Sequence, residues 1–254
     1  MSPIDELAPI LKKLRLSGVL QSLELRVRQT VEDDVHPAEF LLRVLHDEVE
    51  RREGKQLEQR LRRAAFEPNR TFENFDFLFN PQVPKAKLID LATCSFITRK
   101  ENVLLVGQSG VGKSHLAQAL GHRACLAGHE VLYVPAHQLL GSMRAARADG
   151  SYERRLARLA TVNLLIVDDL GLHPLRHDEP TDLYELIRVR YETGPIVITS
   201  NRDIEEWPPL FGDALLASAA MDRLLHHAHV IDIEGESYRN PPSKRRGPKA
   251  AKVT

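Results

Sequence analysis

The most informative segment of the chain is Gly107-Gln108-Ser109-Gly110-Val111-Gly112-Lys113-Ser114. It follows an apolar run at 102–106 and precedes a helix-like pattern from His115 to about Leu126. Glycines at 107, 110 and 112 permit unusual backbone dihedrals, so that successive N–H groups can converge on an anion. A plain glycine turn between two elements is the alternative. The complete match in a strand–loop–helix context instead predicts a phosphate-binding P-loop.

Within this loop, two side chains have defined roles in binding ATP and magnesium. Lys113 is expected to contact the β- and γ-phosphates, and Ser114 to place its hydroxyl on Mg²⁺. The following helix presents its positive N-terminal end to the same anion. We therefore expect the nucleotide to be held by Gly107, Gln108, Ser109, Gly110, Val111, Gly112, Lys113, Ser114 and His115.

A second apolar run ends in two carboxylates, Asp168 and Asp169. Asp168 is expected to hold Mg²⁺, directly or through water, and Asp169 to polarise the attacking water. Glu is often used for the second role, so the shorter Asp169 leaves a binding-only nucleotide switch as an alternative. An ordinary strand-ending turn is the other interpretation of the Asp-Asp-Leu-Gly sequence.

A third run ends in Thr199-Ser200-Asn201 at the same predicted edge of the sheet. Asn201 could orient the water or sense the γ-phosphate. The alternative role for Asn201 is a helix cap before the segment 204–207.

Short apolar runs alternate with helical patterns beyond residue 68, which predicts an α/β fold with a parallel sheet flanked by helices. Residues 1–67 show the three-to-four spacing of amphipathic helices, with Pro37 suited to a helix start. We expect a helical N-terminal DNA- or partner-binding domain at 1–67, an ATPase domain at 68–238 and a basic tail at 239–254 that lacks order without a partner. The predicted strands lie at 102–106, 130–134, 163–167, 195–199 and 230–233.

Composition restricts the possible classes of protein. The chain has 254 residues, 43% of them hydrophobic, and 35 basic against 35 acidic residues, so net charge does not argue for or against nucleic acid. The two cysteines cannot form a disulfide framework or a cysteine-rich zinc site. The N-terminus lacks a signal-peptide pattern and no apolar window would span a bilayer, so a cytoplasmic location and no membrane partner are expected.

The order of these three motifs resembles the AAA+ ATPases. The resemblance becomes closer over Thr199-Ser200-Asn201-Arg202 and over the segment 216–224, Leu-Ala-Ser-Ala-Ala-Met-Asp-Arg-Leu. It is closest to the IstB-like transposition helper ATPases and extends over most of the chain, and DnaC-type helicase loaders share the same core.

This resemblance implies an arginine finger, Arg223, that reaches the ATP site of a neighbouring subunit, and a second sensor arginine, Arg239. It also implies a homo-oligomer with ATP sites between subunits, which assembles on duplex DNA, hydrolyses ATP and delivers bent target DNA to the transposase of the same insertion sequence. DNA breakage and joining would belong to that partner.

Basic residues cluster in two segments of the chain, where solvated helix faces are the alternative to DNA contact. The candidate DNA-binding residues are Arg51, Arg52, Lys55, Arg60, Arg62, Arg63, Arg154 and Arg155. A replicative helicase loader remains the nearest rival in mechanism. A P-loop small-molecule kinase is a rival from another class, which Asn201, Arg223 and the basic helical extension disfavour.

Overall fold

The computed structural model describes residues 3–239, so the expected basic tail at 239–254 lies outside the described residues except for Arg239. The chain divides into two compact units, Met1–Gln59 and Arg60–Thr254. This division falls within a helix, whereas the sequence suggested a boundary after residue 67. Among the described residues, none of the helices combines the length and the apolar character that crossing a bilayer requires.

The first unit is helical, as predicted. It contains α1 (Pro3–Lys13), α2 (Ser17–Glu32) and most of α3 (Pro37–Ala64), which begins at the predicted proline. A small apolar core joins the three helices and contains Leu11, Val19, Leu23 and Val44. The remaining turns of α3 belong to the second unit.

A buried carboxylate, Glu48, ties α2 to α3 inside the first unit. Its Oε2 accepts hydrogen bonds from the backbone N–H groups of Gly18 and Val19 at the start of α2. Its Oε1 accepts a 2.7 Å hydrogen bond from Nε of Arg52. The carboxylate thus satisfies N–H groups that have no partner within the helix, and it engages one of the arginines expected to face DNA.

The second unit contains a five-stranded sheet with the order β2-β3-β4-β1-β5. Every pair of neighbouring strands is parallel, which confirms the predicted α/β class. Because β3, β4 and β1 are adjacent, their carboxyl ends meet at one edge of the sheet. The strands are β1 (Val103–Val106), β2 (Val131–Pro135), β3 (Leu164–Leu170), β4 (Ile196–Ser200) and β5 (His229–Asp232).

For four of the strands, both ends lie within one residue of the predicted ends. The exception is β3, which extends to Leu170 rather than ending at 167. The sequence placed the two aspartates just after this strand, whereas the structure includes both of them in it. An irregularity in the pairing of β3 with β4 accounts for the difference and is described with the site.

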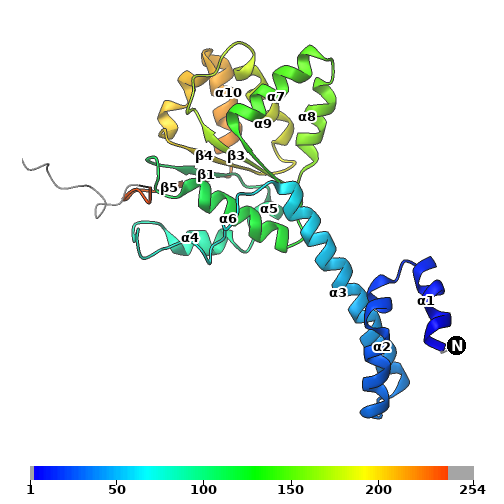
Figure 1. Cartoon of the computed structure of the whole chain (residues 1–254). Coiled ribbons are helices and arrows are strands. Elements are labelled where there is room, and N and C mark those ends of the chain that lie inside the picture. Colours follow the sequence, from blue (N-terminus) through cyan, green and yellow to red (C-terminus); the bar gives the residue numbers. More distant parts are fainter. Residues whose placement is uncertain (1–2, 240–254) are drawn as a thin grey trace, which may run out of the picture. The chain divides into compact units, whose positions relative to one another are not determined.

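Helices cover both faces of the sheet (Figure 1). One face packs against α4 (Lys85–Leu91), α5 (Ser95–Arg99) and α6 (Lys113–Leu126). On the other face, strand residues such as Leu104 and Val167 share a core with Leu139, Leu186 and Leu224. The covering elements there are α7 (Ala136–Ala148), α8 (Tyr152–Thr161), α9 (Glu179–Arg190), η1 (Ile204–Glu206), η2 (Pro208–Phe211) and α10 (Ala214–Leu225).

Candidate functional site

The predicted phosphate loop joins the end of β1 to the start of α6. Gly107 has φ 135°, and a Cβ at this position would overlap the carbonyl oxygen of Ile233. Gly112 has φ 102° and precedes the first residue of α6, where a Cβ would meet the ring of Phe75. Both positions therefore require glycine, because the backbone has a positive φ and because a Cβ would overlap neighbouring atoms.

Lys113, the first residue of α6, is only 4% exposed. Its Nζ donates hydrogen bonds to the carbonyl oxygens of Gly107 and Gln108, each at 2.7 Å, and to Oδ1 of Asn201 at 2.6 Å. Burial lowers the pKa of Lys113 to about 8, although the nearby carboxylates of Asp169 and Asp168 act in the opposite direction. The ammonium group thus lies within the loop, close to both predicted carboxylates.

A bulge in β3 directs both aspartates into the same pocket. Val167 pairs with Ile198 and Leu170 pairs with Ser200, so one extra residue is accommodated in β3. Asp169 takes up the irregularity with φ 58°, a left-handed conformation that Asp and Asn adopt more readily than most residues. In a regular strand, consecutive side chains would face opposite sides of the sheet. The bulge instead lets Asp168 and Asp169 line one pocket.

This pocket has a volume of about 500 Å³ and lies at the carboxyl edge of the sheet. Burial raises the pKa of Asp169, and the neighbouring Asp168 carboxylate adds to the effect. Asn201 does not cap η1, since Asp203 precedes that helix, and its side chain faces Lys113 instead. The predicted residues that line the pocket are Ser109, Gly110, Gly112, Lys113, Ser114, His115, Asp168, Asp169, Asn201 and Arg239.

Three residues of the predicted loop do not line this pocket. Gly107 and Gln108 line an adjoining hollow and contact Lys113 through their carbonyl groups. Val111 is fully buried.

Aromatic side chains form one wall of the pocket. Phe75 contacts the rings of His115 and Tyr238, with centroids 5.2 and 5.4 Å apart. The backbone N–H of Tyr238 donates to the carbonyl oxygen of Gly110, so the chain near the C-terminal end of the unit packs directly on the phosphate loop. The sequence assigned no role to Tyr238, which lies far along the chain in a segment without periodicity.

The donor groups in this pocket fit a magnesium–nucleotide complex. The Ser114 hydroxyl and the two carboxylates offer oxygen atoms, which Mg²⁺ prefers, and Lys113 offers a cation for phosphate. Within residues 3–239 there is no group of three His, Cys, Asp or Glu side chains that could hold a metal ion by themselves. A serine hydroxyl and two carboxylates are the donor set expected for a metal that also takes oxygens from phosphate and water.

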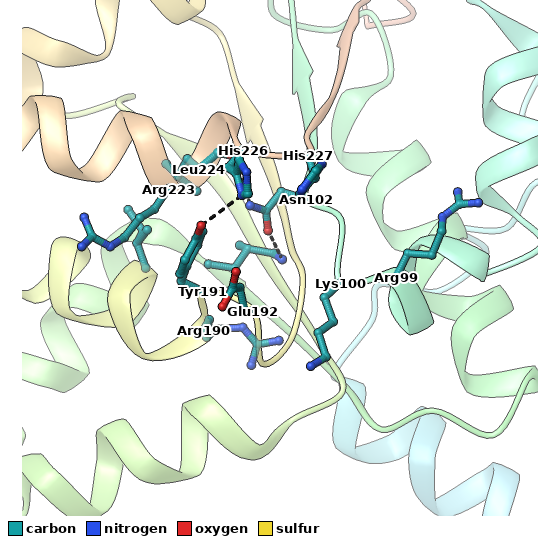
Figure 2. Close-up of a pocket in the computed structure, with 12 residues that line it drawn as sticks. Arg99, Lys100, Asn102, Arg190, Tyr191, Glu192, Arg223, Leu224, His226 and His227 are labelled. Atoms are coloured by element: carbon teal, nitrogen blue, oxygen red, sulfur yellow. Dashed lines mark hydrogen bonds between the residues drawn. The ribbon is translucent and has the colours of Figure 1, made fainter.

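Arg223 lies away from this pocket. It belongs to α10 and lines a different pocket, of about 370 Å³, with Asn102 and Ile196 at the amino ends of β1 and β4. Its guanidinium donates to the carbonyl oxygen of Ala219. Figure 2 shows that Arg223, Arg99 and Lys100 point in different directions, so these cations do not converge on a common ligand within one chain.

The candidate DNA-binding residues lie on helices, and several already have partners. Arg52 pairs with Glu48, and Arg63 forms a 3.0 Å ion pair with Glu130. Arg155 donates to the Ser142 hydroxyl at 3.0 Å. The exposed members of the set include Arg62, Arg154 and Lys55.

Comparison with known proteins identifies relatives over almost the whole chain. The family model described as IstB-like ATP binding protein matches residues 9–246. A protein named for ATP binding in insertion sequence IS21 of Pseudomonas aeruginosa is 37% identical over 96% of this chain and 92% of its own. An insertion-sequence ATP-binding protein of Mycobacterium tuberculosis is 41% identical over 93% of this chain and 94% of its own.

Solved structures share the fold at lower sequence identity. DnaI has a TM-score of 0.56 and 22% identity, with 65% of this chain and 90% of that chain covered. DnaA from Aquifex aeolicus, solved with AMPPCP, has a TM-score of 0.54 and 20% identity over 67% of this chain. The match spans about half of the DnaA chain, 51%. These similarities support the AAA+ core fold.

The buried position of Lys113 predicts that nucleotide binding takes up protons above pH 8. The pKa of Lys113 is about 8 without nucleotide, and phosphate would raise it by favouring the charged form. Affinity should therefore fall as pH rises through 8, and binding near pH 9, roughly one unit above that pKa, should protonate the lysine. Calorimetry in two buffers that differ in ionisation enthalpy measures this uptake.

Lys113→Arg is the matched variant, because a guanidinium stays charged throughout this range. It should bind nucleotide without the additional proton uptake. Equal uptake by the wild type and by this variant would show that Lys113 is already protonated in the free protein.

Asp169→Asn tests the second carboxylate without disturbing the bulge, because Asn also tolerates the left-handed conformation. We expect ATP turnover to fall by about 10²–10⁴-fold, the usual contribution of a general base, while ATP affinity is retained. Steady-state hydrolysis and equilibrium binding measure the two effects. Asp90→Asn, on the exposed side of α4, is the control. Normal turnover in Asp169→Asn would remove this carboxylate from the reaction.

Proposed function

The chain belongs to the family of IstB-like ATP-binding proteins, and we propose that it is an ATPase that assembles on duplex DNA and assists a transposase. In this proposal ATP is bound between subunits of a homo-oligomer. Hydrolysis then changes the assembly, so that remodelled target DNA is delivered to the transposase. The DNA breakage and joining belong to that partner.

The observation that carries the proposal is the separation of Arg223 from the phosphate pocket. Lys113, Asp169 and Asn201 gather at the carboxyl ends of the strands, whereas Arg223 lies at their amino ends. A head-to-tail contact between two copies would bring the Arg223 end of one subunit to the phosphate end of the next. Such a permanently charged guanidinium stabilises the charge that develops on a transferring phosphoryl group.

The pocket residues divide the chemistry of hydrolysis among them. Lys113 would neutralise the phosphate oxygens, and its hydrogen bonds to backbone carbonyls and Asn201 hold the cation within the loop. Asp169 would accept a proton from the attacking water, and its raised pKa makes it a better base than an exposed aspartate. Asn201, hydrogen-bonded to Lys113, is positioned to respond when the γ-phosphate displaces that contact.

Ser114 and Asp168 would hold Mg²⁺, with further oxygens from phosphate and water. The bound ion would supply positive charge to the phosphate oxygens. The hydroxyl and carboxylate oxygens of these two residues are the kind of donor that Mg²⁺ prefers, which supports this assignment.

The DNA and transposase parts of the proposal rest on the family and on surface charge. The relatives described above carry the names of insertion-sequence proteins. Exposed Lys55, Arg62 and Arg154 could contact phosphates without reading sequence, so their effect on affinity should decrease steeply with salt. Duplex DNA and a transposase are therefore the proposed partners.

Mixing two inactive variants tests the shared site. Lys113→Ala removes phosphate binding, and Arg223→Ala removes the guanidinium that acts on the neighbour. In an equimolar mixture, about a quarter of head-to-tail interfaces should combine an intact Lys113 with an intact Arg223 by random assortment. We expect DNA-stimulated ATP turnover to return to about that fraction of the wild-type rate, whereas each variant alone stays inactive.

The matched control replaces Lys113→Ala with the double variant Lys113→Ala, Arg223→Ala. This mixture has no interface with both groups intact and should remain inactive. An absence of rescue in the first mixture, or equal rescue in both, would contradict a finger that acts between subunits.

A further inference from the structure

Both oxygens of the Asp168 carboxylate already accept hydrogen bonds from side-chain hydroxyls. The Tyr133 hydroxyl donates to Oδ2 at 2.6 Å, and the Thr199 hydroxyl donates to Oδ1. All three side chains are buried, with Asp168 at 4% exposure and Thr199 at 0%. A carboxylate has about four acceptor positions, so two remain for other donors.

The direction of the Thr199 hydrogen bond follows from a second contact. The backbone N–H of Asp169 donates to the Thr199 hydroxyl oxygen at 2.9 Å. The oxygen is thus an acceptor on that side, and its own hydrogen is free to point at Asp168. Thr199 therefore links the side chain of Asp168 to the backbone of the bulge residue.

Tyr133 reaches Asp168 diagonally across two strands. Tyr133 pairs with Ile166, and Pro135 pairs with Asp168, so the tyrosine must extend over two residues, about 7 Å along the strand. Pro135 stands opposite Asp168 and offers no N–H or side-chain donor. The long phenol of Tyr133 supplies the donor from the same strand.

Tyr133 is a permanent donor in this position. A tyrosine hydroxyl ordinarily keeps its proton up to a pH of about 10, and this hydroxyl donates that proton to Oδ2 of Asp168 at 2.6 Å. The phenol therefore keeps its proton across the range in which the protein would work. Its ring also contacts Phe66, with centroids 6.4 Å apart, so the ring can be kept while the hydroxyl alone is removed.

We propose that Tyr133 and Thr199 are positioning residues that fix the Asp168 carboxylate for a hydrated divalent cation bound with ATP. This inference rests on the proposed function. With one donor on each oxygen, the carboxylate cannot rotate freely, and its remaining lone pairs would be available to a hydrated cation. Three adjacent strands, β2, β3 and β4, each contribute one member of this cluster.

Tyr133→Phe is the first test, with a fluorescent, non-hydrolysable ATP analogue as the probe. Binding is titrated with Mg²⁺, and separately measured in excess chelator. Loss of a group that orients a metal ligand lowers metal affinity by about tenfold or more. We expect the Mg²⁺ midpoint to rise by about tenfold, while affinity without Mg²⁺ stays within about twofold of the wild type.

Tyr152→Phe is the matched control, since it removes a phenol hydroxyl from α8 in the same unit, outside the phosphate pocket. It should leave the Mg²⁺ midpoint unchanged. An unchanged midpoint in Tyr133→Phe, or an equal loss of affinity with and without Mg²⁺, would overturn the inference. Failure of the wild type to bind the analogue under either condition would overturn the proposed function as well.

A pair of substitutions at Thr199 provides an independent test if Tyr133→Phe does not fold. Thr199→Ser keeps the hydroxyl and should retain the wild-type midpoint. Thr199→Val removes the hydroxyl at similar size and should raise the midpoint. If both variants bind Mg²⁺ with the same midpoint, the hydroxyl has no role in positioning Asp168.

Discussion

The buried ammonium group of Lys113 is the feature on which the site depends. A cation with 4% exposure requires hydrogen-bond acceptors, and it finds them in two loop carbonyls and Asn201. These acceptors come from the end of β1 and from the residue after β4, so the cation can be satisfied only when those strands are neighbours. The sheet order fulfils that condition and also places β3 with its two carboxylates beside β4. A phosphate group entering the pocket would replace neutral acceptors by charged ones.

Local sequence was sufficient to predict the phosphate loop, because its glycines and Lys113 act within a few residues of one another. The strands were predictable as short apolar runs for the same reason. The bulge at Asp169 could not be predicted, since it depends on pairing between β3 and β4, which lie far apart in sequence. Its left-handed conformation offers a physical reason for a short Asp where a longer Glu is often used.

Tyr133 and Thr199 show why the supporting groups of the site were missed. An aromatic residue in a buried strand is typical of a hydrophobic core, and only the register of β2 with β3 reveals that its hydroxyl reaches Asp168. The opposite positions of Arg223 and the phosphate pocket likewise become clear only once the sheet is known. The reason is that α10 lies far in sequence from both the phosphate loop and the two aspartates. Their separation supports, in our proposal, a site that two subunits complete.

Sedimentation of the wild-type protein with plain duplex DNA, with and without ATP, at about 0.15 M salt, tests whether the ATP site is shared between subunits on DNA. A shared site predicts large protein–DNA complexes that form only when ATP and duplex are both present. A protein that stays monomeric under all conditions, or that assembles equally well without ATP, would contradict an ATP site shared between subunits on DNA.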